Sequence, residues 1–232
     1  MILADLHIGI EREFFEKGIR IGKMIEENKK EIMDLINETK CRKLVLLGDV
    51  KHRIPGISAS EETEMSDFLN ELSKHAELLV IKGNHDGELQ KFAGGNIKVY
   101  EAGGIRIGSI SLNHGHSWPT EEMMQADYLI MAHNHPSIEL VDKLGYRTIS
   151  RVWVIGKLDS KRLEKRYKKF NKNIKVVIMP AFNELVGGLS FNKHKARELL
   201  GPLFKNEIFK LEDAEIYLLS GIDLGKVKNL RY

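Results

Sequence analysis

Histidine, aspartate and asparagine gather in a series of short polar clusters along this chain, and nearly every cluster directly follows an apolar run. Ligands of α/β sheets collect at the carboxyl ends of strands, so we expect these clusters to meet in one region. Taken in order, the clusters are Asp5-x-His7, Gly48-Asp49-x-x-His52, Gly83-Asn84-His85-Asp86, His114-Gly115-His116 and His133-x-His135.

These side chains supply carboxylate oxygen, amide oxygen and imidazole nitrogen but no thiolate. Such a set suits Mn, Fe, Zn, Ni or Co and disfavours a cysteine-type structural zinc. It holds more donors than one ion uses, so we expect two ions about 3.5–4 Å apart, bridged by a carboxylate and a hydroxide. Each cluster alone has an ordinary explanation as a turn or a chance pairing, but their joint order favours a metal site that acts on phosphorus.

The first half of the chain contains the alternating elements that would position these clusters. Apolar residues recur at helical spacing in residues 21–40, and residues 60–76 open with Ser60-x-x-Thr63 and acidic residues, the pattern of a helix N-terminus. Short apolar runs ending in polar residues lie around these segments. This order predicts parallel strands joined by right-handed helical crossovers. The strands are expected at residues 1–5, 43–49 and 77–83, and the helices at 21–40 and 60–76.

The second half has a strand-rich pattern. It predicts a hairpin over residues 96–112 that turns at Gly103-Gly104. Further strands are expected at 128–133, 137–158, 174–180 and, as a closing hairpin, 214–230. The fold class that follows is α/β, with two mixed sheets packed as a sandwich and flanked by helices, in a single domain over residues 1–232.

Composition narrows the setting of the protein. The chain has 232 residues, a net charge of +3 and one cysteine, Cys41. A lone cysteine excludes an internal disulfide and fits a reducing compartment, so we expect a cytoplasmic protein. No apolar run reaches the roughly 18 residues of a membrane span, and the start of the chain lacks the pattern of a signal peptide. The oligomeric state is left open.

Residues 157–175 carry nine basic side chains against two acidic ones. Such a stretch is either a solvated charged surface or a patch that binds a phosphate backbone. Tyr167 and Phe170 lie between the basic residues and are compatible with both interpretations.

In this order the clusters resemble the motifs of the calcineurin-like metallophosphoesterases. The resemblance covers residues 5–135, and its one departure is Ala132, which stands where the family usually has glycine. It implies that the first metal is bound by Asp5, His7 and His135. It implies that the second metal is bound by Asn84, His114 and His133, with Asp49 as the bridge, and that a metal-bridging hydroxide attacks phosphorus.

The resemblance also implies roles around the substrate. His85 would lie beside the scissile phosphate as transition-state stabiliser or general acid, with Asp86 orienting its ring. His52 would be a second histidine that faces the substrate. Three further residues are weaker candidates for substrate or outer contacts: Arg12, Arg20 and His116.

Several blocks are similar to those of the SbcD-related archaeal phosphoesterases and the bacterial ligase-associated DNA-damage-response endonucleases. They are "GDVKH", "AHNHP" and "MPAFNELVGG". This similarity implies a manganese-dependent phosphodiesterase or nuclease that acts on DNA or RNA in DNA repair. Two alternatives remain, a hydrolase of a small phosphoester and a metal-binding scaffold for protein interaction. The intact His85 and the complete ligand set argue against the scaffold.

Overall fold

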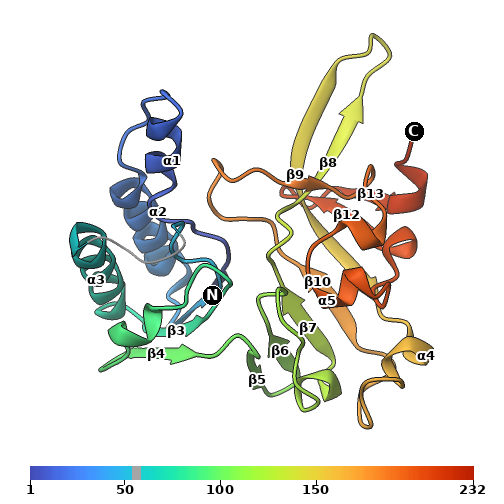
Figure 1. The fold of residues 1–232 in the computed structure, drawn as a ribbon, viewed down its shortest axis with the longest axis horizontal. Helices are drawn as coiled ribbons and strands as arrows, with labels where there is room; N and C mark the ends of the chain where they lie inside the picture. Colours follow the sequence, from blue (N-terminus) through green and yellow to red (C-terminus); the bar gives the residue numbers. More distant parts are fainter. Residues whose placement is uncertain (54–58) are drawn as a thin grey trace. The chain divides into compact units, whose positions relative to one another are not determined.

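The computed structural model describes residues 1–53 and 59–232, which form two compact units (Figure 1). The first unit contains residues 1–101 and 182–186, and the second contains residues 102–181 and 187–232. The expectation of a single domain therefore stays a prediction.

The first unit is a parallel sheet in the order β1-β2-β3-β4 with helices between its strands. The repeated β-α-β connection predicted from the sequence is confirmed here. Its strands are β1 (Ile2–Leu3), β2 (Lys43–Leu47), β3 (Glu77–Ile81) and β4 (Ile97–Tyr100). Its helices are α1 (Ile10–Glu16), α2 (Met24–Thr39) and α3 (Ala59–Ser73), with a short 3₁₀ turn at Leu89–Phe92.

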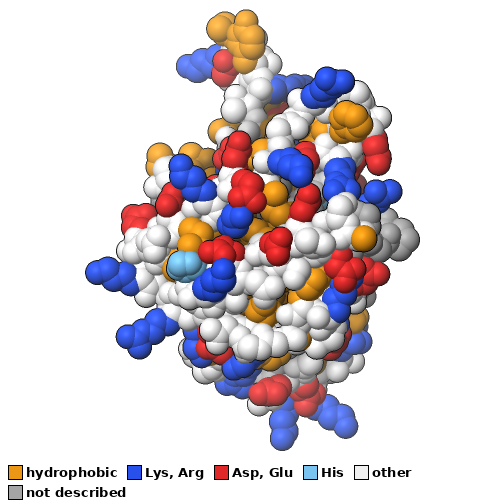
Figure 2. All heavy atoms as spheres, turned by 90° about the vertical axis from the view of Figure 1, so that its left-hand side faces the viewer, with side chains coloured by type: hydrophobic (Ala, Val, Ile, Leu, Met, Phe, Trp, Pro, Cys, Tyr) orange, Lys and Arg blue, Asp and Glu red, His pale blue; other side chains and the backbone are white. Residues whose placement is uncertain are grey.

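The two longer helices form because their apolar residues recur on one face. In α2 the buried face includes Ile25, Ile32 and Ile36, and in α3 it includes Phe68 and Leu72. Each such side chain contributes about 1.5–3 kcal/mol when it leaves water. The opposite faces are charged, and Figure 2 shows acidic and basic side chains interspersed over this side of the molecule.

The second unit is built on a mixed sheet in the order β11-β8-β9-β10-β7-β6-β5, with β12 pairing with both β9 and β13. β9 is the longest strand and pairs antiparallel with β8, β10 and β12. The strands are β5 (Ile105–Ile107), β6 (Ile110–Leu112), β7 (Tyr128–Met131), β8 (Pro136–Val141), β9 (Arg147–Lys157), β10 (Lys175–Ile178), β11 (Leu189–Ser190), β12 (Glu215–Leu218) and β13 (Asp223–Lys226).

Short helices complete the second unit. They are α4 (Ser160–Leu163) and α5 (Pro202–Lys205), with 3₁₀ turns at Met123–Gln125, Ala196–Glu198, Leu211–Asp213 and Val227–Asn229. None of the described helices is both long and apolar enough to cross a membrane.

The hairpin predicted over residues 96–112 is wrong in its turn and its partners. Residues 97–100 form β4, which pairs parallel with β3 in the first unit. The hairpin instead joins β5 and β6 around Gly108. Gly104 has a different constraint, since its φ is +88° and a Cβ there would lie 2.1 Å from the carbonyl oxygen of Leu112.

Candidate metal centre

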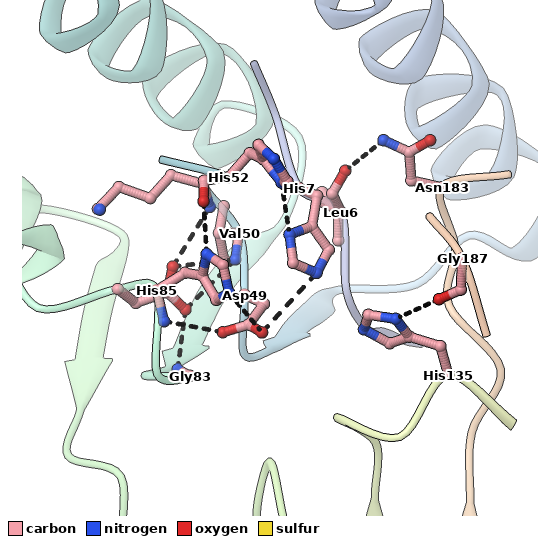
Figure 3. A network of polar contacts seen from close by, with 12 residues as sticks. Leu6, His7, Asp49, Val50, His52, Gly83, His85, His135, Asn183 and Gly187 are labelled. Atoms are coloured by element: carbon pink, nitrogen blue, oxygen red, sulfur yellow. Dashed lines mark hydrogen bonds and ion pairs between the residues drawn. The ribbon is translucent and has the colours of Figure 1, made fainter. Parts of the chain in front are cut away.

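Three acidic and imidazole side chains converge at the carboxyl ends of β1 and β2. Asp5 and His7 follow β1, Asp49 follows β2, and each offers a ligand atom within 4.8 Å of the others. All three are buried, with exposed fractions of 0%, 3% and 2%. His7 Nε2 lies 3.7 Å from Asp49 Oδ2 (Figure 3).

This group fits a divalent cation. Metal–ligand bonds of about 2.0–2.2 Å place neighbouring ligand atoms roughly 3–4 Å apart, which is the spacing between His7 and Asp49. Two carboxylates that are removed from water also need positive charge nearby, because an uncompensated buried charge is costly. Asp5, His7 and Asp49 are therefore suited to hold a metal ion.

The backbone at these positions is unusual. Asp5, His7 and Asp49 have φ values of 55°, 45° and 48°, in the left-handed region that side chains rarely adopt. His133 and His135 of the second unit share this conformation, with φ values of 70° and 42°. Each such residue costs on the order of 1–3 kcal/mol, and such strain concentrates at functional sites. Most of the left-handed non-glycine residues that the structure describes are thus predicted ligands.

The loop after β3 is tied to the loop after β2 through the Asp86 carboxylate. It accepts hydrogen bonds from the backbone N–H groups of Gly83 (2.8 Å), Val50 (3.0 Å) and Lys51 (3.2 Å). Gly83 packs so closely that a Cβ would lie 2.1 Å from Asp49 Oδ1. Glycine is required here for close approach.

His85 and Asn84 follow Gly83 in this loop. The backbone N–H of His85 donates to Asp49 Oδ1 at 3.0 Å, and its ring Nδ1 donates to the carbonyl of His52. His85 Nε2 lies 3.8 Å from Asp49 Oδ2. Asn84 is exposed. The orienting role that the sequence suggested for Asp86 stays a prediction, while the hydrogen bond from His85 Nδ1 orients the ring toward the His52 backbone.

A cavity of about 420 Å³ adjoins His52 and His85 within the first unit. Its other lining residues include Arg12, Glu13 and Glu61. The Arg12 guanidinium lies 3.2 Å from Glu61, so its charge is partly compensated. Arg20 is exposed at the surface. The predicted substrate contacts of Arg12 and Arg20 stay predictions.

The predicted ligand histidines of the second unit follow β6 and β7. The rings of His114 and His133 lie 5.0 Å apart, centroid to centroid, and each offers a ligand nitrogen within 4.8 Å of the other. The His116 ring lies 5.3 Å from that of His114. His135 Nδ1 donates to the carbonyl of Gly187 at 2.9 Å (Figure 3), a hydrogen bond that orients the ring.

Asn183 is a site residue that the sequence did not single out, although it lies in the quoted "MPAFNELVGG" block. Its Nδ2 donates to the carbonyl of Leu6 at 2.8 Å, between Asp5 and His7. Its Oδ1 accepts from the Leu185 backbone at 3.0 Å. Asn183 is 2% exposed, so this buried hydrogen bond fixes the loop that contains Asp5 and His7.

The basic segment 157–175 is anchored by its aromatic residues. Tyr167 is buried and donates to the carbonyl of Pro119 at 2.7 Å, and Phe170 packs against the core of the second unit. Burial raises the pKa of the Tyr167 hydroxyl. Arg166 lies 3.8 Å from the centre of the Trp118 ring. Tyr167 and Phe170 are thus structural, and the lysines between them supply the surface charge.

Comparisons with known proteins give a family match and several structural relatives, among them a nuclease and a phosphoesterase. The calcineurin-like phosphoesterase family model matches residues 1–208. The nuclease MPE of Pseudomonas putida has a TM-score of 0.54 at 18% identity, over 97% of this chain and 85% of that one. YfcE, a phosphoesterase from E. coli, has a TM-score of 0.40 at 19% identity, over 60% and 70%. A search of curated proteins finds no significant match. At this identity the nuclease supports the fold alone.

Proposed function

This chain belongs to the calcineurin-like phosphoesterase family, and from that membership we propose that it is a metal-dependent phosphodiesterase that cleaves nucleic acid. The family implies metal-dependent hydrolysis of a phosphoester. The observation that carries the proposal is the buried group of Asp5, His7 and Asp49, whose donor atoms have the chemistry and spacing of a metal site.

Asp49 is the proposed bridge, and manganese is the first choice of ion, with Ni, Fe, Zn or Co as alternatives. When bound, a pair of such ions lowers the pKa of water and neutralises charge on a phosphate. The proposed ligands are Asp5, His7 and His135 for one ion and Asn84, His114 and His133 for the other.

His85 is the residue we propose to act on the substrate. Its Nδ1–H is held by the carbonyl of His52, so Nε2 is the nitrogen available to the phosphate. A protonated Nε2 would stabilise the charge that develops on phosphate oxygen or give its proton to the leaving oxygen. His85 and His52 both line the cavity described above.

Two observations favour nucleic acid as the substrate. Basic residues outnumber acidic ones nine to two in residues 157–175, and lysines and arginines bind a phosphate backbone without regard to sequence. A nuclease of the same fold makes nucleic acid the first polymer to test. The alternative is a small phosphoester, since a cavity of about 420 Å³ falls within the size range of small-molecule sites.

The test is an activity matrix of metals against substrates. The wild type should cleave bis-p-nitrophenyl phosphate and a single-stranded oligonucleotide with Mn. His85→Ala should lose on the order of a hundredfold or more in kcat, as expected for loss of an acid catalyst, and should keep its metal content. His75→Ala, an exposed histidine outside every cluster, is the matched control and should behave as wild type.

Two outcomes would redirect the proposal. Cleavage of p-nitrophenyl phosphate without any cleavage of diesters or oligonucleotide in Mn, Ni or Zn would favour the small-phosphoester hydrolase. Less than one equivalent of bound metal after reconstitution would favour the protein-interaction scaffold.

A further inference from the structure

Glu13, His52 and His7 form a continuous chain of polar contacts in the first unit. Glu13 Oε2 lies 2.6 Å from His52 Nε2, and His52 Nδ1 lies 3.1 Å from His7 Nδ1. This series of contacts starts at Glu13 on α1, passes through His52 in the loop after β2 and ends at His7, a proposed metal ligand. No motif that we recognised in the sequence includes Glu13.

We propose that Glu13 is a positioning residue that sets, through His52, which ring nitrogen of His7 carries the proton. It thereby prepares Nε2 of His7 to bind metal. This inference rests on the metal site of the proposed function, and it adds the outer residues that order its first histidine ligand.

The argument begins at Glu13, because an ionised carboxylate can only accept hydrogen bonds. The hydrogen bonds from Lys17 and from His52 lower the pKa of Glu13 to about 2. Lys17 is four residues further along α1, the spacing at which helical side chains pair. With Glu13 ionised, the short contact to His52 requires that His52 Nε2 carries a proton.

The proton on His52 then determines the proton on His7. When His52 is neutral it has one N–H, so a proton on its Nε2 makes its Nδ1 an acceptor, whereas a protonated ring would donate from both nitrogens. The 3.1 Å contact therefore requires His7 Nδ1 to donate. Nε2 of His7 keeps its lone pair, and it lies 3.7 Å from Asp49 Oδ2. Two acceptors that face one another at this distance suit a shared cation.

The series of contacts from Glu13 to His7 also gives His52 a positioning role. Both of its ring nitrogens have partners in the chain, and its carbonyl accepts from the His85 ring. We assign to His52 the ordering of His7 and His85, and the direct substrate contact expected from the sequence stays a prediction. A ligand histidine that donates its second nitrogen to an outer partner is a common arrangement, and losing that partner costs about 10–100-fold in metal affinity.

The test reads the tautomers of the metal-free protein by ¹⁵N–¹H correlation spectra of the histidine rings. His7 should carry its proton on Nδ1 and His52 on Nε2. In Glu13→Gln the amide can accept or donate, so both rings should shift toward mixed tautomers, and Mn affinity should fall by about tenfold or more.

Two controls separate this effect from a change in fold. Glu16→Gln removes the same charge from the same helix, and Lys17→Gln breaks the ion pair of Glu13 while leaving the contact to His52. Both should keep the wild-type tautomers and Mn affinity. Circular dichroism should show the same helix content in all variants.

The inference is overturned if wild-type His7 carries its proton on Nε2, or if Glu13→Gln leaves both rings unchanged. Its failure is distinguishable from failure of the proposed function, because the spectra need neither substrate nor turnover. If the protein shows the expected tautomers but cleaves no phosphoester, the inference about Glu13 is supported and the proposed phosphodiesterase function is contradicted.

Discussion

Three residues of the proposed metal centre have a strained backbone conformation, and each of them offers a side chain that could bind metal. Asp5, His7 and Asp49 adopt left-handed φ values. For a residue other than glycine this conformation costs on the order of 1–3 kcal/mol of conformational free energy. The surrounding structure must therefore fix these residues firmly. Asp86 does part of this by accepting backbone hydrogen bonds from Val50 and Gly83.

Gly83→Ala tests how closely these loops pack. The new methyl group would lie 2.1 Å from Asp49 Oδ1 and 2.3 Å from the Asp49 backbone nitrogen. Forced shifts of this kind cost about 1–3 kcal/mol, so we expect a lower unfolding temperature and weaker Mn binding by calorimetry. Gly87→Ala, where a Cβ meets nothing within 4 Å, should change neither. Wild-type Mn affinity in Gly83→Ala would contradict the expectation.

Elements far apart in the sequence support the ligand loops. Asn183 follows β10 in the sequence but belongs to the first unit, where its Nδ2 donates to the carbonyl of Leu6. Asn183→Ala leaves that buried carbonyl without this donor, which costs about 1–3 kcal/mol in unfolding free energy. The free energy of unfolding measured with denaturant and the Mn affinity measured by titration should both fall. Asn173→Ala, at an exposed position, is the control. If Asn183→Ala has the wild-type unfolding free energy and Mn affinity, Asn183 does not support the ligand loop.

β8 carries a carboxylate whose stabilising effect depends on pH. Glu139 is buried, and its hydrogen bonds from Tyr232 and Lys193 lower its pKa in the folded protein. A lowered folded pKa stabilises the fold above the unfolded value of about 4.3 and loses that effect as pH falls through the folded pKa. The difference in unfolding free energy between wild type and Glu139→Gln should therefore be larger at neutral pH than near pH 3. An equal difference at both pH values would contradict this.

The segment around α4 is the element that tests nucleic-acid binding. Replacing Lys161, Lys165, Lys168 and Lys169 with Gln should weaken binding of single-stranded DNA by His85→Ala protein. The slope of log affinity against log salt should fall by about 0.7 for each lost contact. Four lysines of the first unit (Lys29, Lys30, Lys43 and Lys74) provide the charge-matched control. An unchanged slope would return this segment to an ordinary charged surface.

At the scale of the whole molecule, metal should be linked to stability. A ligand that binds only the folded state stabilises it by about 2.7 kcal/mol at one hundred times its Kd. Mn should therefore raise the unfolding temperature of the wild type, and chelation should reverse the rise. Asp49→Asn should lose most of this shift because the proposed bridge loses its charge. A full Mn-dependent rise in Asp49→Asn would exclude Asp49 as a bridging ligand.

The sequence alone determined the features that depend on local pattern. Helical spacing predicted α2, because the period of apolar residues records which face is buried. The acidic opening of residues 60–76 predicted α3, because acidic residues stabilise the N-terminus of a helix. Polar residues after apolar runs predicted the convergence of Asp5, His7 and Asp49 within the first unit, because parallel strands end at the same edge of a sheet.

Only the tertiary structure decided features that depend on contacts across the chain. The turn near Gly103-Gly104 looked like a hairpin, but strand partners are chosen by long-range pairing and β4 joined β3. Glu13 meets His52 across 39 residues and Asn183 meets Leu6 across 177. No local pattern marks such residues, because a carboxylate or an amide acquires its role from whichever donor or acceptor the fold places beside it.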